Sequence, residues 1–112
     1  VSLDITLIGP DYASEEHSVG VIVSDIRSPY DWNLSNRLIR CAEKVLEPGR
    51  WNQQVAFHFS TDANASYFAG NNLKSGAFGP ATLSTHGRER THMDALVGTE
   101  NLCRAYVLGY GD

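Results

Sequence analysis

The sequence has few cysteines, no cluster of basic residues and no long apolar run, and each absence excludes a class of protein. Cys41 and Cys103 lie far apart, without the C-x-x-C spacing of a zinc knot or a redox pair, so we interpret both as buried thiols of a reducing compartment. The nine Lys and Arg residues never run together, and thirteen Asp and Glu outnumber them, which gives a net charge of -4. We therefore expect no nucleic-acid partner.

No apolar segment approaches the roughly 18 residues that suggest a membrane span, and the first residues lack the positively charged start of a signal peptide. We therefore expect no membrane partner and a cytoplasmic location. The sequence begins at Val1 and enters a predicted strand at once, which is typical of a piece of a larger protein. Its 112 residues predict one domain with a core that is marginal by itself.

Two hydrophobic periodicities alternate along the chain. Period-two or continuous apolar runs predict four strands, over residues 2–8, 19–23, 54–59 and 75–84. Apolar residues at helical spacing predict three helices, over residues 33–47, 61–69 and 91–108. Strands that alternate with helices are typical of the α/β class, here with a sheet of about four strands. Ligands of such sheets bind beyond the strand ends, so the loops after Phe59 and after Leu83 are the candidate sites.

The densest group of reactive side chains lies between the last predicted strand and the last predicted helix, in the segment THGRERTH over residues 85–92. Its histidines, His86 and His92, do not have the H-E-x-x-H spacing of a zinc-binding helix. The segment can be a metal- and substrate-binding loop or a solvated charged loop, and the residues alone favour the second. Nucleophilic catalysis finds no support, because no serine lies in a G-x-S-x-G motif and neither cysteine has a histidine close in sequence.

Two aspartates are further candidates. Asp4 is a carboxylate within an apolar strand, and burial of such a group without a partner is costly. It therefore either has a cation or strong hydrogen-bond donors nearby, or lies at a strand end that faces water. Asp62 follows Ser60-Thr61 and is most simply interpreted as a helix cap.

Four segments, in this order, resemble the closing third of the metallopeptidase family that includes the tetrahedral and glutamyl aminopeptidases: LDIT, SPYDWNLSNRLI, STDANASYFAGN and STHGRERTHMDALVGTENL. The chain most resembles the subgroup encoded with bacterial osmoprotectant-dipeptide synthesis. The resemblance covers nearly all of the chain, and its last motif is the specific one. It implies that residues 1–112 are the C-terminal part of a metallopeptidase catalytic domain, built as a three-layer α/β/α, zinc-peptidase-like half domain.

The resembled family uses two divalent metal ions, zinc or cobalt, that share a bridging carboxylate, with a glutamate as general base. The resemblance implies that Asp4 and His86 are metal ligands, one for each ion, with His92 as the alternative to His86. It also implies that Asp62 shapes the substrate-binding pocket. The base and the other ligands belong to an earlier part of the family's sequence. We therefore expect no catalytic residue in this chain, and the isolated chain can lack bound metal.

These implications favour part of a metal-dependent aminopeptidase that hydrolyses N-terminal residues of peptides. We expect the isolated chain to be inactive and the parent protein to be a homo-oligomer. The alternative is a non-catalytic scaffold or binding domain derived from such an enzyme, which the short length of 112 residues favours.

Overall fold

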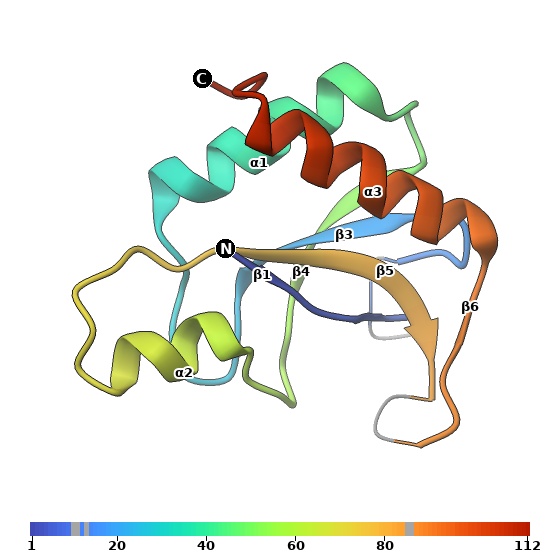
Figure 1. Cartoon of the computed structure of the whole chain (residues 1–112). Helices are drawn as coiled ribbons and strands as arrows, with labels where there is room; N and C mark the ends of the chain where they lie inside the picture. The colour runs from blue at the N-terminus through green and yellow to red at the C-terminus, as the bar shows by residue number, and fades with distance from the viewer. Residues whose placement is uncertain (10–11, 13, 85–86) are drawn as a thin grey trace.

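Strands and helices alternate along the chain and build an α/β fold, as the sequence predicts (Figure 1). The computed structural model describes residues 1–9, 12, 14–84 and 87–112. Three helices and an open mixed sheet make up this part of the chain. None of its helices has the length and the apolar character that crossing a membrane requires.

The sheet mixes parallel and antiparallel strands. Its main path runs β1-β5-β3-β4, with β1 at Ser2–Leu3, β5 at Ala77–Leu83, β3 at Val19–Ser24 and β4 at Trp51–Val55. The β3–β4 and β1–β5 pairs are parallel, and the β3–β5 pair is antiparallel. Two short strands, β2 (Thr6–Leu7) and β6 (Arg90–Thr91), pair with the second half of β5. The main path thus has the expected number of strands.

Two strand predictions were wrong at their bounds. The strand expected over residues 2–8 is divided into β1 and β2, with Asp4 and Ile5 between them. The strand expected over residues 54–59 is β4, which begins at Trp51 and ends at Val55. The apolar alternation that suggested it continues past the strand as exposed surface, since Phe57 is 55% exposed.

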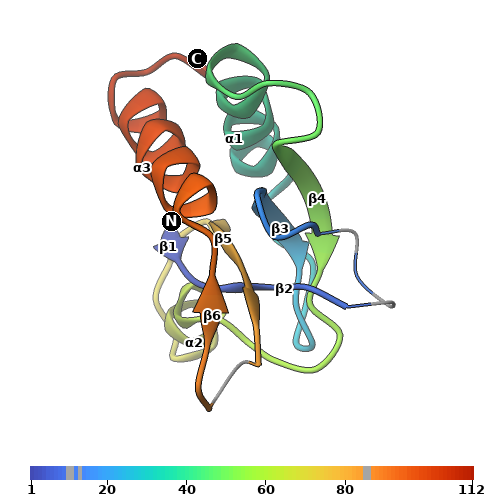
Figure 2. The ribbon, with the colours of Figure 1, turned by 90° about the vertical axis from the view of Figure 1, so that its right-hand side faces the viewer.

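The two long helices cover one face of the sheet. Helices α1 (Trp32–Val45) and α3 (Met93–Val107) lie side by side there, whereas α2 (Asp62–Phe68) lies on the other side (Figure 2). The main core joins these two helices to the sheet, and its largest fully buried side chains are Val19, Val21, Leu38, Phe78 and Leu102. Asp31 caps α1, and its carboxylate accepts a hydrogen bond from the Leu34 N–H at 2.9 Å.

Helix α3 faces the sheet with its small side chains. Its buried residues are Ala95, Gly98, Leu102 and Ala105. A Cβ on Gly98 would lie 2.9 Å from Cγ2 of Val19, so the glycine allows the helix to approach β3 closely. Larger apolar residues of α3 lie on the opposite, solvent-facing side of the helix. Two of them, Met93 and Val107, are 66% and 74% exposed.

Candidate functional site

Asp4 lies in the break between β1 and β2, where its backbone crosses close to β5. Its N–H donates to the Phe78 carbonyl at 3.0 Å, and its Oδ1 accepts a hydrogen bond from the Ile5 N–H at 2.8 Å. The Asp4 carbonyl fills the volume of a side chain on Gly79, because a Cβ on that glycine would lie 1.4 Å from the Asp4 oxygen. Asp4 directly follows the last residue of β1 and is half-buried.

His86, the second predicted metal ligand, lies outside the described residues. On its N-terminal side β5 ends at Leu83, and Ser84 adopts a left-handed conformation with φ of 62°. On its C-terminal side β6 turns back along β5, with Leu83 opposite Arg90. The assignment of Asp4 and His86 as ligands of neighbouring ions stays a prediction.

Asp62 is the first residue of α2 and is exposed. Its neighbour Thr61 occupies the cap position but makes no side-chain cap hydrogen bond. Instead, the Thr61 N–H donates to Oδ2 of the buried Asp25 at 3.1 Å. The start of α2 is thus fixed by a carboxylate from the end of β3, and the predicted role of Asp62 in substrate binding stays a prediction.

Asp25 is the centre of a buried hydrogen-bond network. Its Oδ2 accepts from the Tyr30 hydroxyl at 2.8 Å, and its Oδ1 accepts from Asn64 Nδ2 at 2.8 Å and from the Arg27 N–H at 2.8 Å. Burial acts to raise the pKa of Asp25, but these hydrogen bonds outweigh it and hold the pKa below its usual value. Burial also raises the pKa of Tyr30, and the charges of Asp25 and Asp4 contribute to the same direction. Asp4 therefore acts electrostatically on this network.

A groove of about 440 Å³ runs beside this network. Tyr30 and Asn64 form its polar wall, and Tyr67, Phe68 and Leu73 form an apolar wall. Because Asn64 and Tyr30 both donate to Asp25, the buried carboxylate fixes two side chains of the groove.

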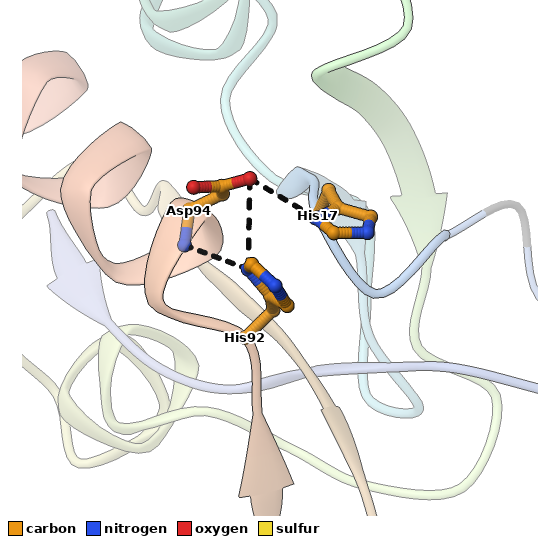
Figure 3. A group of neighbouring side chains, drawn as sticks. All are labelled: His17, His92 and Asp94. Atoms are coloured by element: carbon orange, nitrogen blue, oxygen red, sulfur yellow. Dashed lines mark hydrogen bonds and ion pairs between the residues drawn. The ribbon is translucent and has the colours of Figure 1, made fainter.

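A second cluster of titratable side chains joins the loop before β3 to the start of α3 (Figure 3). His17 Nδ1 lies 3.1 Å from Asp94 Oδ2, and His92 Nδ1 lies 3.6 Å from the same oxygen. The two imidazole rings have their centroids 4.0 Å apart. These three side chains offer three potential metal-ligand atoms, all within 4.8 Å of one another. We call them the His17–His92–Asp94 cluster.

The local sequence explains why these side chains converge. His92 occupies the cap position of α3, and its Nδ1 accepts a hydrogen bond from the Asp94 N–H at 3.0 Å. His17 is held from the other side by a tight turn, in which the Ser18 N–H and hydroxyl both donate to the Glu15 carbonyl. The hydrogen bond from His17 lowers the pKa of Asp94, and the charges of His92 and Arg50 act in the same direction.

Sequence reasoning singled out His92 but not its partners. His17 lies 75 positions away in a polar loop, so no spacing rule connects it to His92. Asp94 lies in the first turn of α3, where a carboxylate is favourable for the helix dipole and does not by itself indicate a metal ligand. Asp25 was also missed, although an aspartate directly after the buried strand Val19–Ser24 is at a position where α/β folds bind ligands.

Comparisons with known proteins show a family and a relative to which the chain is similar. The family model described as M42 glutamyl aminopeptidase matches residues 1–102. A curated Bacillus subtilis (strain 168) protein, named "Putative aminopeptidase YhfE", is 31% identical to the chain over 107 residues. This match covers 96% of the chain but 30% of the relative, so the chain spans less than a third of the relative's length.

Proposed function

The chain belongs to the M42 glutamyl aminopeptidase family, and from this premise we propose that it is part of a metal-dependent enzyme that removes N-terminal residues from peptides. The observation that carries the proposal is the family match over residues 1–102, a range that includes both predicted ligands, Asp4 and His86. The cytoplasmic location and the homo-oligomeric parent protein belong to the same proposal.

The donor types of Asp4 and His86 suit the metal ions that the family implies. Zinc and similar borderline cations accept carboxylate oxygen and neutral imidazole nitrogen. The backbone of Asp4 is held against β5 by its hydrogen bond to Phe78, and this contact would help to orient the carboxylate. The bound ions would polarise the scissile carbonyl and activate water. One aspartate and one histidine do not complete two coordination spheres, so we propose that preceding polypeptide of the parent protein supplies the other ligands and the general base.

The surface of the chain supports such an arrangement. β1 lies at one end of the sheet path, where Leu3 is 58% exposed. Helix α3 exposes Met93 and Val107, which lie on the same side of the helix. Leu96 and Val97 of the same helix are also exposed, and exposed apolar residues that cluster in this way commonly mark a surface that other polypeptide covers. We propose that the part of the catalytic domain without a counterpart here packs against this surface, since the match covers 30% of the relative's length.

The test measures hydrolysis of leucine amide by the full gene product, before and after chelation and after zinc or cobalt is restored. We expect activity that depends on metal and that falls at least about a hundredfold in Asp4→Asn and in His86→Gln, because ligand loss costs more than the 10- to 100-fold typical of residues that only support a ligand. Asp31→Asn is the matched control, since asparagine also caps helices. Full activity in both ligand variants would refute the assignment.

A separate measurement tests the isolated 112-residue chain. We expect no turnover of leucine amide with added zinc or cobalt, because the chain lacks the proposed general base. Turnover by the isolated chain would contradict this expectation. A full gene product that forms a defined oligomer but never hydrolyses leucine amide would instead indicate the non-catalytic scaffold.

A further inference from the structure

We propose that the His17–His92–Asp94 cluster is a binding site for a single divalent ion of the zinc class, separate from the pair formed by Asp4 and His86. The proposal does not rest on peptidase activity. It rests on the chemistry and geometry of three side chains from two distant parts of the sequence.

The separations between the ligand atoms fit a tetrahedral site. Bonds of about 2.0–2.1 Å to zinc place two ligand atoms of a tetrahedron about 3.3 Å apart. The observed separations from Asp94 Oδ2 are 3.1 Å to His17 Nδ1 and 3.6 Å to His92 Nδ1. These two separations lie on either side of the tetrahedral value, and all three ligand atoms lie within 4.8 Å of one another.

The local charge also favours a cation. The carboxylates of Asp94 and Glu16 lie next to His17, at 3.1 Å and 3.3 Å from its ring nitrogens. Arg50 contributes one positive charge, at 3.1 Å from Asp94. With neutral imidazoles, two carboxylates against one guanidinium leave one net negative charge. Arg50 must turn away when a metal binds, and its side chain is 45% exposed, so solvent can receive it.

The backbone around the cluster is already held in place. Thr91, beside His92, donates its hydroxyl to the Ala81 carbonyl at 2.8 Å, which fixes the start of α3 to β5. Ser18, beside His17, is fully buried at the start of β3. The ligands are thus presented by anchored segments, while their side chains remain 36–50% exposed and open to an incoming ion and water.

Binding has one identifiable cost. In the structure His92 Nδ1 accepts the Asp94 N–H, and a metal on that nitrogen would replace this cap hydrogen bond. The N-terminal end of a helix also disfavours a cation, although the carboxylate of Asp94 in the first turn offsets that effect. We therefore expect binding that stabilises the chain measurably but is weaker than that of a fully enclosed structural zinc site.

The experiment titrates the 112-residue chain with zinc chloride and follows binding by calorimetry and thermal unfolding. We expect one ion per chain, and a rise in Tm of about 10 °C at a hundredfold excess of zinc over its Kd. Substitution of cobalt should give the visible absorption of tetrahedral coordination. Binding should weaken as pH falls, because protons compete with the metal for imidazole nitrogen.

Three variants make the test specific. The double variant His17→Gln/His92→Asn keeps a side chain that can cap α3, and it should lose at least about a hundredfold in affinity. His58→Gln removes an exposed histidine elsewhere and should bind zinc as the unchanged chain does. Asp4→Asn/His86→Gln should also retain the ion, which separates this site from the predicted peptidase ligands.

Two outcomes would overturn the proposal. The first is no zinc binding, or zinc binding that the His17→Gln/His92→Asn variant retains in full. The second is loss of the ion in the Asp4→Asn/His86→Gln variant, which would assign the ion to those residues. Neither outcome depends on whether the gene product is an active aminopeptidase.

Discussion

Replacement of Gly79 by alanine should damage the sheet and displace Asp4 at the same time. The added Cβ would lie 1.4 Å from the Asp4 carbonyl oxygen, where a normal carbon–oxygen contact is about 3.3 Å. The obstructing atom belongs to the backbone, so no rotamer change can relieve the overlap. The chain near Asp4 must therefore move by about 2 Å relative to β5.

A movement of that size breaks hydrogen bonds that join β1 and β2 to β5. The Asp4 N–H to Phe78 carbonyl bond is 3.0 Å long, and its neighbours from Ser2 to Gly76 and from Ile8 to Thr82 are 2.9 and 3.0 Å. Each contributes about 1 kcal/mol net to stability. Loss of one to three of them, with overpacking that typically costs about 1–3 kcal/mol, gives an expected destabilisation of about 2–6 kcal/mol.

Urea unfolding followed by tryptophan fluorescence would measure this loss. Gly87→Ala is the matched control, because the nearest atom to its Cβ would be 3.9 Å away, and we expect a change within about 0.5 kcal/mol. In the full gene product, the same Gly79→Ala substitution should reduce peptidase activity by moving the proposed ligand Asp4. A Gly79→Ala chain as stable as the Gly87→Ala chain would refute the reasoning.

Three further predictions concern the packing and charge of the fold. Asp25→Asn should lower the free energy of unfolding in urea by about 2–4 kcal/mol, because an amide cannot accept hydrogen bonds from all the donors around the carboxylate. An Asp25→Asn chain as stable as the unchanged chain would contradict this. The pKa of Asp25 is lower in the folded chain than in the unfolded chain, so the ionised carboxylate stabilises the fold above about pH 4. This contribution to the free energy of unfolding is lost as pH falls through the lowered pKa. The Asp25→Asn chain should therefore lose less stability in acid. Gly98→Val should lower the free energy of unfolding by about 2 kcal/mol or more, because Val19 would lie 2.9 Å from the new Cβ. Val107→Gln, on the exposed side of α3, should change it by less than about 0.5 kcal/mol. Equal effects of the two substitutions would contradict the packing of α3.

Local patterns predicted most of the fold because local forces determine those elements. Apolar residues at helical spacing predicted a helix over residues 33–47, and the structure has α1 there, capped by the Asp31 carboxylate. The bounds of β4 were wrong because alternation reports which residues share a face, and not whether a partner strand exists beside them. The pairing of β4 with β3 ends at Val55, and Phe57 beyond it is exposed.

The break at Asp4 was also beyond local reasoning. Residues 2–8 alternate well enough for one continuous strand, but the Asp4 carbonyl lies over Gly79, far away in sequence. The contact exists only because β1 and β5 pair in parallel. A glycine in a strand can indicate the close approach of another backbone, but the sequence does not say which backbone it is.

The pairing of β5 with β6 separates the two sites that we propose for the THGRERTH segment. Its pairing fixes Leu83 opposite Arg90 and Thr82 opposite Thr91, so the chain returns to the sheet immediately before His92. The predicted ligand His86 belongs to the sequence between the paired strands, while the pairing itself sets the start of α3. The position of His92 next to His17 thus depends on the β5–β6 register, and not on whether His86 binds a metal. The two histidines of the THGRERTH segment should therefore be separable by mutation, although sequence reasoning treated them as alternatives for one role.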